Sequence, residues 1–265
     1  MTLIGMPEAW NRVARDYRRH ILPDFLPAAR ALCQAAEIHS ADHVLDAACG
    51  PGTAAIAARE LGAARVVGFD YASAMVAVAR EETAGQHDCF SHAVANALAL
   101  PFAAGAFDVV ISSFGLIFAP DPTQAVGEAA RVLRPAGRLG LLVWPPDGSI
   151  GAYQVTAFRH LAIPPSSHDP FQWGVPNQAR AWLDGAFTAI RMQPLVVPFE
   201  AASPSDAWRV LRTATGRVAA AYATLDATNQ RRLDAEMEAF FEPFRRPDGQ
   251  VHWPREAFII TASKS

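Results

Sequence analysis

The chain has 265 residues, of which 51% are apolar, and its 26 acidic and 23 basic side chains give a formal charge of −3. This apolar content excludes a disordered or low-complexity chain, and the length allows one enlarged domain or a core domain with a smaller subdomain. Nucleic-acid binding is not expected, because neutralising phosphates requires a basic surplus that this chain lacks.

The first forty residues are expected to be helical. Apolar side chains recur at helical spacing from Trp10 to Ile21, and arginines occupy the other faces. Because this apolar stripe is short, we expect it to pack on the protein itself rather than on a membrane surface. Residues 1–40 are therefore predicted to form a helical lid segment.

From about Asp42 to Trp144, short apolar or β-branched runs alternate with longer helical ones, which is typical of β-α units in a parallel sheet. Five strands are predicted, over residues 43–47, 65–70, 89–94, 107–112 and 138–144. Three helices are predicted over residues 53–61, 73–82 and 123–133, each beginning at a residue able to cap free amides. Such units form an open, doubly wound sheet whose ligands bind at the carboxyl ends of its strands.

After Trp144 the alternation stops at a Pro-Pro-Asp-Gly turn. The later elements are a helix over residues 177–185, a strand over 188–199, a helix capped by Ser203, a helix near 226–244 and a strand over 256–262. We interpret them as a helical cap inserted between the fifth strand and the last two. The predicted fold is α/β and Rossmann-like, with a seven-stranded, mostly parallel sheet. The predicted domains are the lid segment 1–40, a cofactor-binding core 41–145, and 146–265 with the substrate cap and the last strands.

Cysteine and histidine spacing predicts no metal site. The three cysteines, Cys33, Cys49 and Cys89, fit neither a disulfide framework nor a C-x-x-C motif, which favours a reducing cytoplasm. No stretch of ~18 apolar residues is present to span a bilayer, so integral membrane association is not expected.

A glycine-rich turn carries the main functional signal. The first core strand ends at Asp46 and turns through Gly50 and Gly52 into a helix, so that a ligand can approach the backbone closely. With Ala55, these glycines also match the dinucleotide fingerprint G-x-G-x-x-G/A, and Asp70 at the next strand's end suits a ribose in either case. An NAD(P)-dependent oxidoreductase is therefore an alternative.

The charge of Asp46 separates the two cofactor classes. A carboxylate at this strand tip would repel the pyrophosphate of a dinucleotide, whereas it would attract a cofactor with an amino group and a sulfonium. The sequence therefore favours S-adenosylmethionine, with its ribose on Asp70. The other interpretation of Asp46 is a turn or helix-capping acid.

Five segments occur in the order found in a known family: residues 44–53, 67–75, 95–102, 107–116 and 131–139. On these motifs the sequence resembles the class I S-adenosylmethionine-dependent methyltransferases. Within that family it is similar to the ubiquinone/menaquinone-biosynthesis C-methyltransferases. The resemblance covers about residues 42–144.

The resemblance implies a set of cofactor contacts. The methionine end would be held by Asp46, Gly50 and Gly52, and both ribose hydroxyls by Asp70. Ser113 would lie beside the cofactor at the tip of the fourth strand, where a strand-end cap is the alternative interpretation.

The adenine contacts are likewise implied by the resemblance. Tyr71 and Met75 would pack on the ring, and Asn96 and the Ala97 amide would bind its edge. Met75 as a core residue and Asn96 as a turn residue are the alternatives.

Two alanines depart from the family pattern. Ala48 stands where many relatives have glycine in the first loop, and Ala136 replaces the first glycine of a common Pro-Gly-Gly turn. Both bear on local backbone geometry rather than on a cofactor contact.

The resulting expectation is methyl transfer to a small, lipophilic or aromatic acceptor. Its pocket is expected between the cap, with Phe171 and Trp173, and the N-terminal helix that carries Trp10 and Tyr17. No catalytic residue is assigned; Tyr17 and His20 are the nearest titratable candidates. A protein that binds the cofactor without methylating is a further alternative, and the oligomeric state is not predicted.

Overall fold

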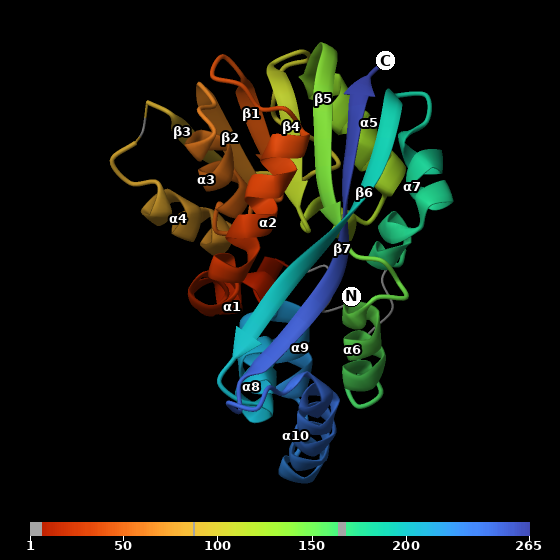
Figure 1. Ribbon diagram of the computed structural model, residues 1–265. Coiled ribbons are helices and arrows are strands. Elements are labelled where there is room, and N and C mark those ends of the chain that lie inside the picture. The colour runs from red at the N-terminus through yellow and green to blue at the C-terminus, as the bar shows by residue number, and fades with distance from the viewer. Residues whose placement is uncertain (1–6, 87, 164–167) are drawn as a thin grey trace.

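The computed structural model describes residues 7–86, 88–163 and 168–265, so the first six residues of the predicted lid segment lie outside it. Its single sheet has the strand order β3-β2-β1-β4-β5-β7-β6 (Figure 1). The first five strands pair in parallel, and β7 is antiparallel to both neighbours. This confirms the predicted seven-stranded, mostly parallel α/β fold. The strands are β1 His43–Ala47, β2 Arg65–Asp70, β3 Phe90–Val94, β4 Phe107–Ser113, β5 Leu133–Val143, β6 Phe187–Ala201 and β7 Val251–Lys264.

Helices cover both faces of the sheet and the carboxyl ends of its parallel strands (Figure 1). The α-helices are α1 Pro7–His20, α2 Leu22–Ala35, α3 Thr53–Glu60, α4 Ser73–Glu82, α5 Pro122–Val132, α6 Ser149–Phe158, α7 Pro176–Leu183, α8 Pro204–Ala214, α9 Gly216–Tyr222 and α10 Ala227–Phe241. Three short 3₁₀ turns are η1 Leu116–Phe118, η2 Pro170–Gly174 and η3 Glu242–Phe244. Sequence analysis missed α6 and α9, which contain or begin with the helix-disfavouring residue glycine, whereas α2 lies in the segment that was expected to be helical.

The helical cap is divided differently from the prediction. Among the described residues, α6, η2 and α7 lie between β5 and β6, whereas α8, α9 and α10 lie between β6 and β7. The β6–β7 hairpin extends beyond the sheet and carries these three helices at its far end (Figure 1). The predicted order of these elements was correct, but their interpretation as one insertion before the last two strands was wrong. The predicted last strand was also too short, because Pro254 interrupts the alternation in the first half of β7.

A buried arginine braces this hairpin where it leaves the sheet. Pro198 pairs with Pro254, and neither residue has an amide hydrogen to donate. Arg255 donates instead, from Nε to Val197 O (3.1 Å) and from Nη2 to Pro198 O (3.0 Å). The Arg255 side chain is 1% exposed, and its Nη2 lies 3.6 Å from Asp24 Oδ2. The side chain therefore replaces strand hydrogen bonds that two prolines remove.

None of the three predicted capping residues, Thr53, Ser73 and Thr123, caps its helix. Helix α5 is capped instead by Asp121, whose side chain accepts from Gln124 N. Gly52 and Ala72 are the N-cap residues of α3 and α4, and neither helix has a side-chain cap. The carboxylates at the ends of the preceding strands take part of this role: Asp46 Oδ2 accepts from Ala55 N, and Asp70 Oδ1 accepts from Ala72 N. The two strand-tip acids thus hold the helix starts beside the glycine turn.

Helix α1 is fastened along α4. Asn11 Oδ1 accepts a hydrogen bond from Ala74 N in the first turn of α4, at 2.8 Å. Ion pairs join Arg15 to Glu81 and Arg18 to Glu82 near the other end. The predicted N-terminal helix therefore packs on the protein, directly beside the carboxyl end of β2.

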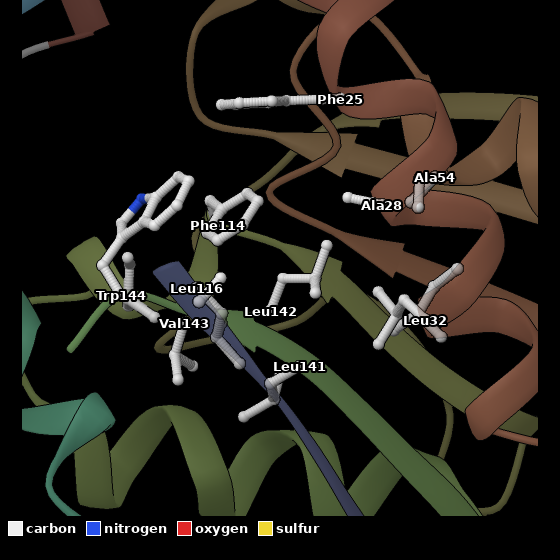
Figure 2. Close-up of a cluster of buried hydrophobic side chains, with 14 of the residues drawn as sticks. Phe25, Ala28, Leu32, Ala54, Phe114, Leu116, Leu141, Leu142, Val143 and Trp144 are labelled. Carbon is white, nitrogen blue, oxygen red and sulfur yellow. The ribbon is translucent and has the colours of Figure 1, made fainter. Parts of the chain in front are cut away.

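An aromatic cluster lies where β4 and β5 end. The rings of Phe114 and Trp144 stack with centroids 3.9 Å apart and planes 8° from parallel, and Phe25 of α2 lies beside both (Figure 2). Phe114 has φ 58°, a conformation unfavourable for a bulky residue. Strain of this kind persists only where surrounding packing imposes it, and it is common at ligand sites.

Replacing Ala136 by glycine should stabilise the protein. Ala136 is exposed, lies in the bulge that interrupts the β4–β5 pairing, and has φ 57°. An alanine in the left-handed backbone conformation costs about 1–2 kcal/mol, which exceeds the entropic cost of placing glycine there. Ala136→Gly should therefore raise the free energy of unfolding by about 0.5–1 kcal/mol. Urea unfolding measures this change. Ala152→Gly, in the exposed face of α6, should lower stability by a similar amount, and equal losses in both variants would contradict the argument.

Candidate functional site

A cavity lies at the carboxyl ends of β1, β2, β4 and β5. These strand ends form one wall, and helices α1, α2, α6, α8 and α9 with the outer part of β7 form the others. Most of its lining is aromatic or aliphatic, and Asp70, Arg217 and Arg255 are the acidic and basic side chains that line it among the described residues. The position agrees with the ligand crevice expected of a doubly wound sheet.

Asp70 joins the glycine turn to the end of β2. Its Oδ2 accepts from Gly50 N at 2.9 Å, and burial raises the pKa of its carboxyl against the opposing effect of the amides. Gly50 has φ 52°, and a Cβ built on it would meet no protein atom within 4 Å. The turn therefore presents bare backbone to the cavity, beside a carboxylate whose remaining lone pairs face the same space.

Asp46 lies behind this turn rather than in the cavity wall. It is 1% exposed, and its Oδ2 accepts from Ala55 N at 2.8 Å, while its Oδ1 has no partner among the described residues. Burial raises its pKa to about 8. Gly52, with φ 90°, also lies outside the wall and packs close to Ala79 of α4. The free oxygen of Asp46 is a buried acceptor suited to a cationic group.

The structure brings five of the nine predicted cofactor residues into the cavity wall. They are Gly50, Asp70, Tyr71, Met75 and Ser113. The hydroxyl oxygen of Ser113 is buried without a hydrogen-bond partner among the described residues.

Asn96 and Ala97 lie outside the cavity wall. Asn96 is exposed, and its Oδ1 accepts from Leu98 N at 3.0 Å, as in the turn considered as its alternative role. Their binding to the adenine edge stays a prediction.

The predictions for the far side of the cavity are partly wrong. Trp10 and Tyr17 line it as expected, but Phe171 and Trp173 do not. Both are buried in the core, because η2 packs against the backbone that follows β5: a Cβ on Gly174 would lie 2.4 Å from the Trp144 carbonyl. His20 is also outside the lining.

Sequence reasoning missed most of the other lining residues, among them Phe114, Trp144, Arg217 and Arg255. Phe114 and Trp144 follow parallel strands, so their position after the fourth and fifth strands was an available signal. Arg217 and Arg255 carry no local signal beyond being isolated cations in largely apolar surroundings.

The part of the chain that the structure describes contains neither a metal-binding cluster nor a membrane-spanning helix. Residues 7–86, 88–163 and 168–265 hold no group of three or more His, Cys, Asp or Glu side chains placed to bind a metal ion. None of the helices in these ranges combines the length and hydropathy needed to cross a membrane.

The fold and cavity together define a Rossmann-like protein that binds a nucleoside-containing cofactor. The family model described as a methyltransferase domain matches residues 45–141. A demethylmenaquinone methyltransferase of Thermus thermophilus is 35% identical over 176 residues, which cover 65% of this chain and 73% of that protein. The chain therefore belongs to the class I S-adenosylmethionine-dependent methyltransferase family, and it is related to the menaquinone and ubiquinone methyltransferases.

Other similar proteins cover different shares of the chain. An uncharacterised protein of Mycobacterium tuberculosis is 37% identical over 130 residues, or 49% of this chain and 47% of that protein. The chain thus matches about half the length of such curated relatives. The crystal structure of the YcgJ protein of Bacillus subtilis has a TM-score of 0.62 at 21% identity, covering 89% of this chain and 98% of that one, and it supports the fold.

Proposed function

We propose that this protein transfers the methyl group of S-adenosylmethionine to a small acceptor with an apolar or aromatic body. One observation carries the proposal: a bare glycine backbone and the Asp70 carboxylate face the same cavity as a cluster of aromatic side chains. The glycine turn suits the cofactor, and the aromatic wall suits the acceptor.

The residues present fit this cofactor. Asp70 would accept from the ribose hydroxyls, Tyr71 and Met75 would pack on the adenine, and the Gly50 backbone would lie against the methionine end. Asp46 behind that turn, whose Oδ1 is unpaired among the described residues, would supply a negative charge to the amino group on losing its proton. Ser113, Gly52 and the Asn96–Ala97 edge complete the proposed set.

The cofactor supplies a methyl group on a sulfonium that already carries its leaving group. The protein's work is then to align the acceptor and to exclude water. Helix α1 forms part of the cavity roof through Trp10 and Tyr17, which supports a covering role for residues 1–40. Burial raises the pKa of Tyr17 well above its usual value, which keeps its hydroxyl protonated and suits it to donate a hydrogen bond.

Binding and turnover test the proposal separately. Calorimetry should show binding of S-adenosylmethionine and no binding of NADH, since an oxidoreductase would show the reverse. Incubation with candidate aromatic acceptors should then yield S-adenosylhomocysteine. Cofactor binding without turnover on any acceptor would favour the non-methylating alternative.

Cofactor affinity should rise with pH. Burial holds the pKa of free Asp46 at about 8, and an adjacent cofactor ammonium would lower it, so binding releases a proton. Between about pH 6 and pH 7.5, where a free amine with a pKa of ~8 is still charged, affinity should increase by up to about tenfold per pH unit. Asp46→Asn should remove this slope. A dissociation constant that is independent of pH in the unaltered protein would contradict the assignment.

A further inference from the structure

The cavity wall contains a cation that forms no ion pair with the described residues. Arg217, the second residue of α9, lines the cavity, and its Nε is buried without a hydrogen-bond partner among the described residues. Its guanidinium lies over the ring of Phe158, 5.5 Å from the centroid, and forms no ion pair with any residue in the described part of the chain. A guanidinium withdrawn from water in this way is costly unless a ligand pairs with it.

The position of Arg217 is fixed by the residue before it. A Cβ on Gly216 would lie 2.8 Å from the Ala9 carbonyl oxygen, so the start of α9 packs directly on the backbone of α1. Burial lowers the pKa of Arg217 to about 10, and the nearby Asp169 and Tyr71 partly oppose this effect. The side chain therefore remains charged at neutral pH.

The other two charged groups of the cavity are already engaged. Arg255 donates to two backbone carbonyls and lies 3.6 Å from Asp24, and Asp70 accepts from two backbone amides. The aromatic wall of Phe114 and Trp144 has no charge. Arg217 is thus the cation in the cavity wall that has free donors.

We infer that the acceptor carries an oxyanion, such as a carboxylate, that pairs with the Arg217 guanidinium while its apolar body lies on the aromatic wall. This inference rests on the proposed function and names the substrate class for it. A guanidinium presents its donors as a planar fork that matches the two oxygens of a carboxylate, and the surrounding apolar lining strengthens the interaction.

A matched pair of probes tests the anion subsite. The protein saturated with S-adenosylhomocysteine is titrated calorimetrically with 2-naphthoate and with 2-naphthamide, which share a ring system and differ in charge. We expect the naphthoate to bind about tenfold more tightly or better. Arg217→Gln should reduce this ratio to within about twofold, and Arg217→Lys should retain part of it.

Controls separate this subsite from general electrostatics and from the cofactor site. Arg212→Gln, on neighbouring α8 and outside the cavity, should leave the probe ratio unchanged. All three variants should bind S-adenosylhomocysteine within about twofold of the unaltered protein. Arg217→Gln should unfold at an equal or higher temperature, because it removes a partly buried charge that forms no ion pair with the described residues.

The outcomes distinguish failure of the subsite from failure of the proposed function. If 2-naphthoate and 2-naphthamide bind the unaltered protein with nearly equal affinity, including the case in which both bind weakly, the subsite is overturned. A loss of S-adenosylhomocysteine affinity in Arg217→Gln, which would assign this arginine to the cofactor carboxylate, also overturns it. If instead the unaltered protein fails to bind S-adenosylhomocysteine, the same titrations are made without it. A ratio that still depends on Arg217 then supports the subsite while the methyl-transfer proposal falls.

Discussion

Asp70→Ala should weaken S-adenosylmethionine binding by about 1.5–3 kcal/mol, or roughly 10- to 150-fold. The lost carboxylate would have accepted hydrogen bonds from ribose hydroxyls, and bonds to a charged acceptor contribute this much. The same substitution frees the amides of Gly50 and Ala72, so the glycine turn also loses its anchor. Calorimetric titration of the cofactor measures the effect, and Asp70→Asn, which keeps one acceptor oxygen, should lose less.

A second aspartate provides the matched control. Asp108 lies at the opposite end of the sheet, where its Oδ2 accepts from His43 N and its Oδ1 pairs with Arg134. Asp108→Ala removes an equivalent carboxylate-to-backbone contact and should leave cofactor affinity within about twofold. An Asp70→Ala variant that is folded and binds the cofactor as well as Asp108→Ala would disprove the ribose assignment.

Arg255→Met should lower the free energy of unfolding by about 3–5 kcal/mol, the usual cost of removing one partner of a buried charged pair. The carbonyls of Val197 and Pro198 lose their donors, and Asp24 loses its counter-charge. Burial already raises the pKa of Asp24 to about 6, so this carboxyl has little other support. Urea unfolding followed by far-ultraviolet circular dichroism measures the change.

An exposed arginine–aspartate ion pair serves as a control for the loss of stability expected when the pair is not buried. Arg209 and Asp206 form an ion pair at 2.6 Å on the surface of α8, and Arg209→Met should cost less than about 1 kcal/mol. Adding Asp24→Asn to Arg255→Met should recover part of the loss, because the stranded charge is then removed. If Arg255→Met and Arg209→Met proved equally mild, the hairpin brace would have no energetic role.

The core of the fold was predictable because its signals are local. Alternating apolar runs predict the bounds of the first four strands to within a residue or so. Within the short stretch from Asp46 to Gly52, the sequence indicates both where the first strand ends and where a ligand can approach the backbone closely. Ala48 and Ala136, identified as departures from glycine, both have the positive φ at which glycine is favoured. The sequence thus predicts the strand ends that face the cavity.

The aromatic wall of the cavity was not predictable in the same way, because it is assembled from distant segments. Phe25, Phe114 and Trp144 meet only after α2 has folded across the ends of β4 and β5. Phe171 and Trp173 were expected in the pocket because they lie in a loop-rich segment of the aromatic second half, but neither feature tells on which side of the chain a ring packs. Arg217 reaches the cavity through the packing of α9 on α1, which no local pattern records.

The extended β6–β7 hairpin connects one part of the cavity wall to the rest of the chain through two neighbouring positions. Ala201 pairs with Val251, so the chain leaves the hairpin and returns to it at neighbouring positions, with α8, α9 and α10 in between. Segments whose ends lie close together are the ones that tolerate exchange between related proteins. Exchange of residues 202–250 should therefore change the part of the lining formed by Leu211, Thr215, Arg217 and Val218, while the strand ends with Phe114 and Trp144 stay as they are.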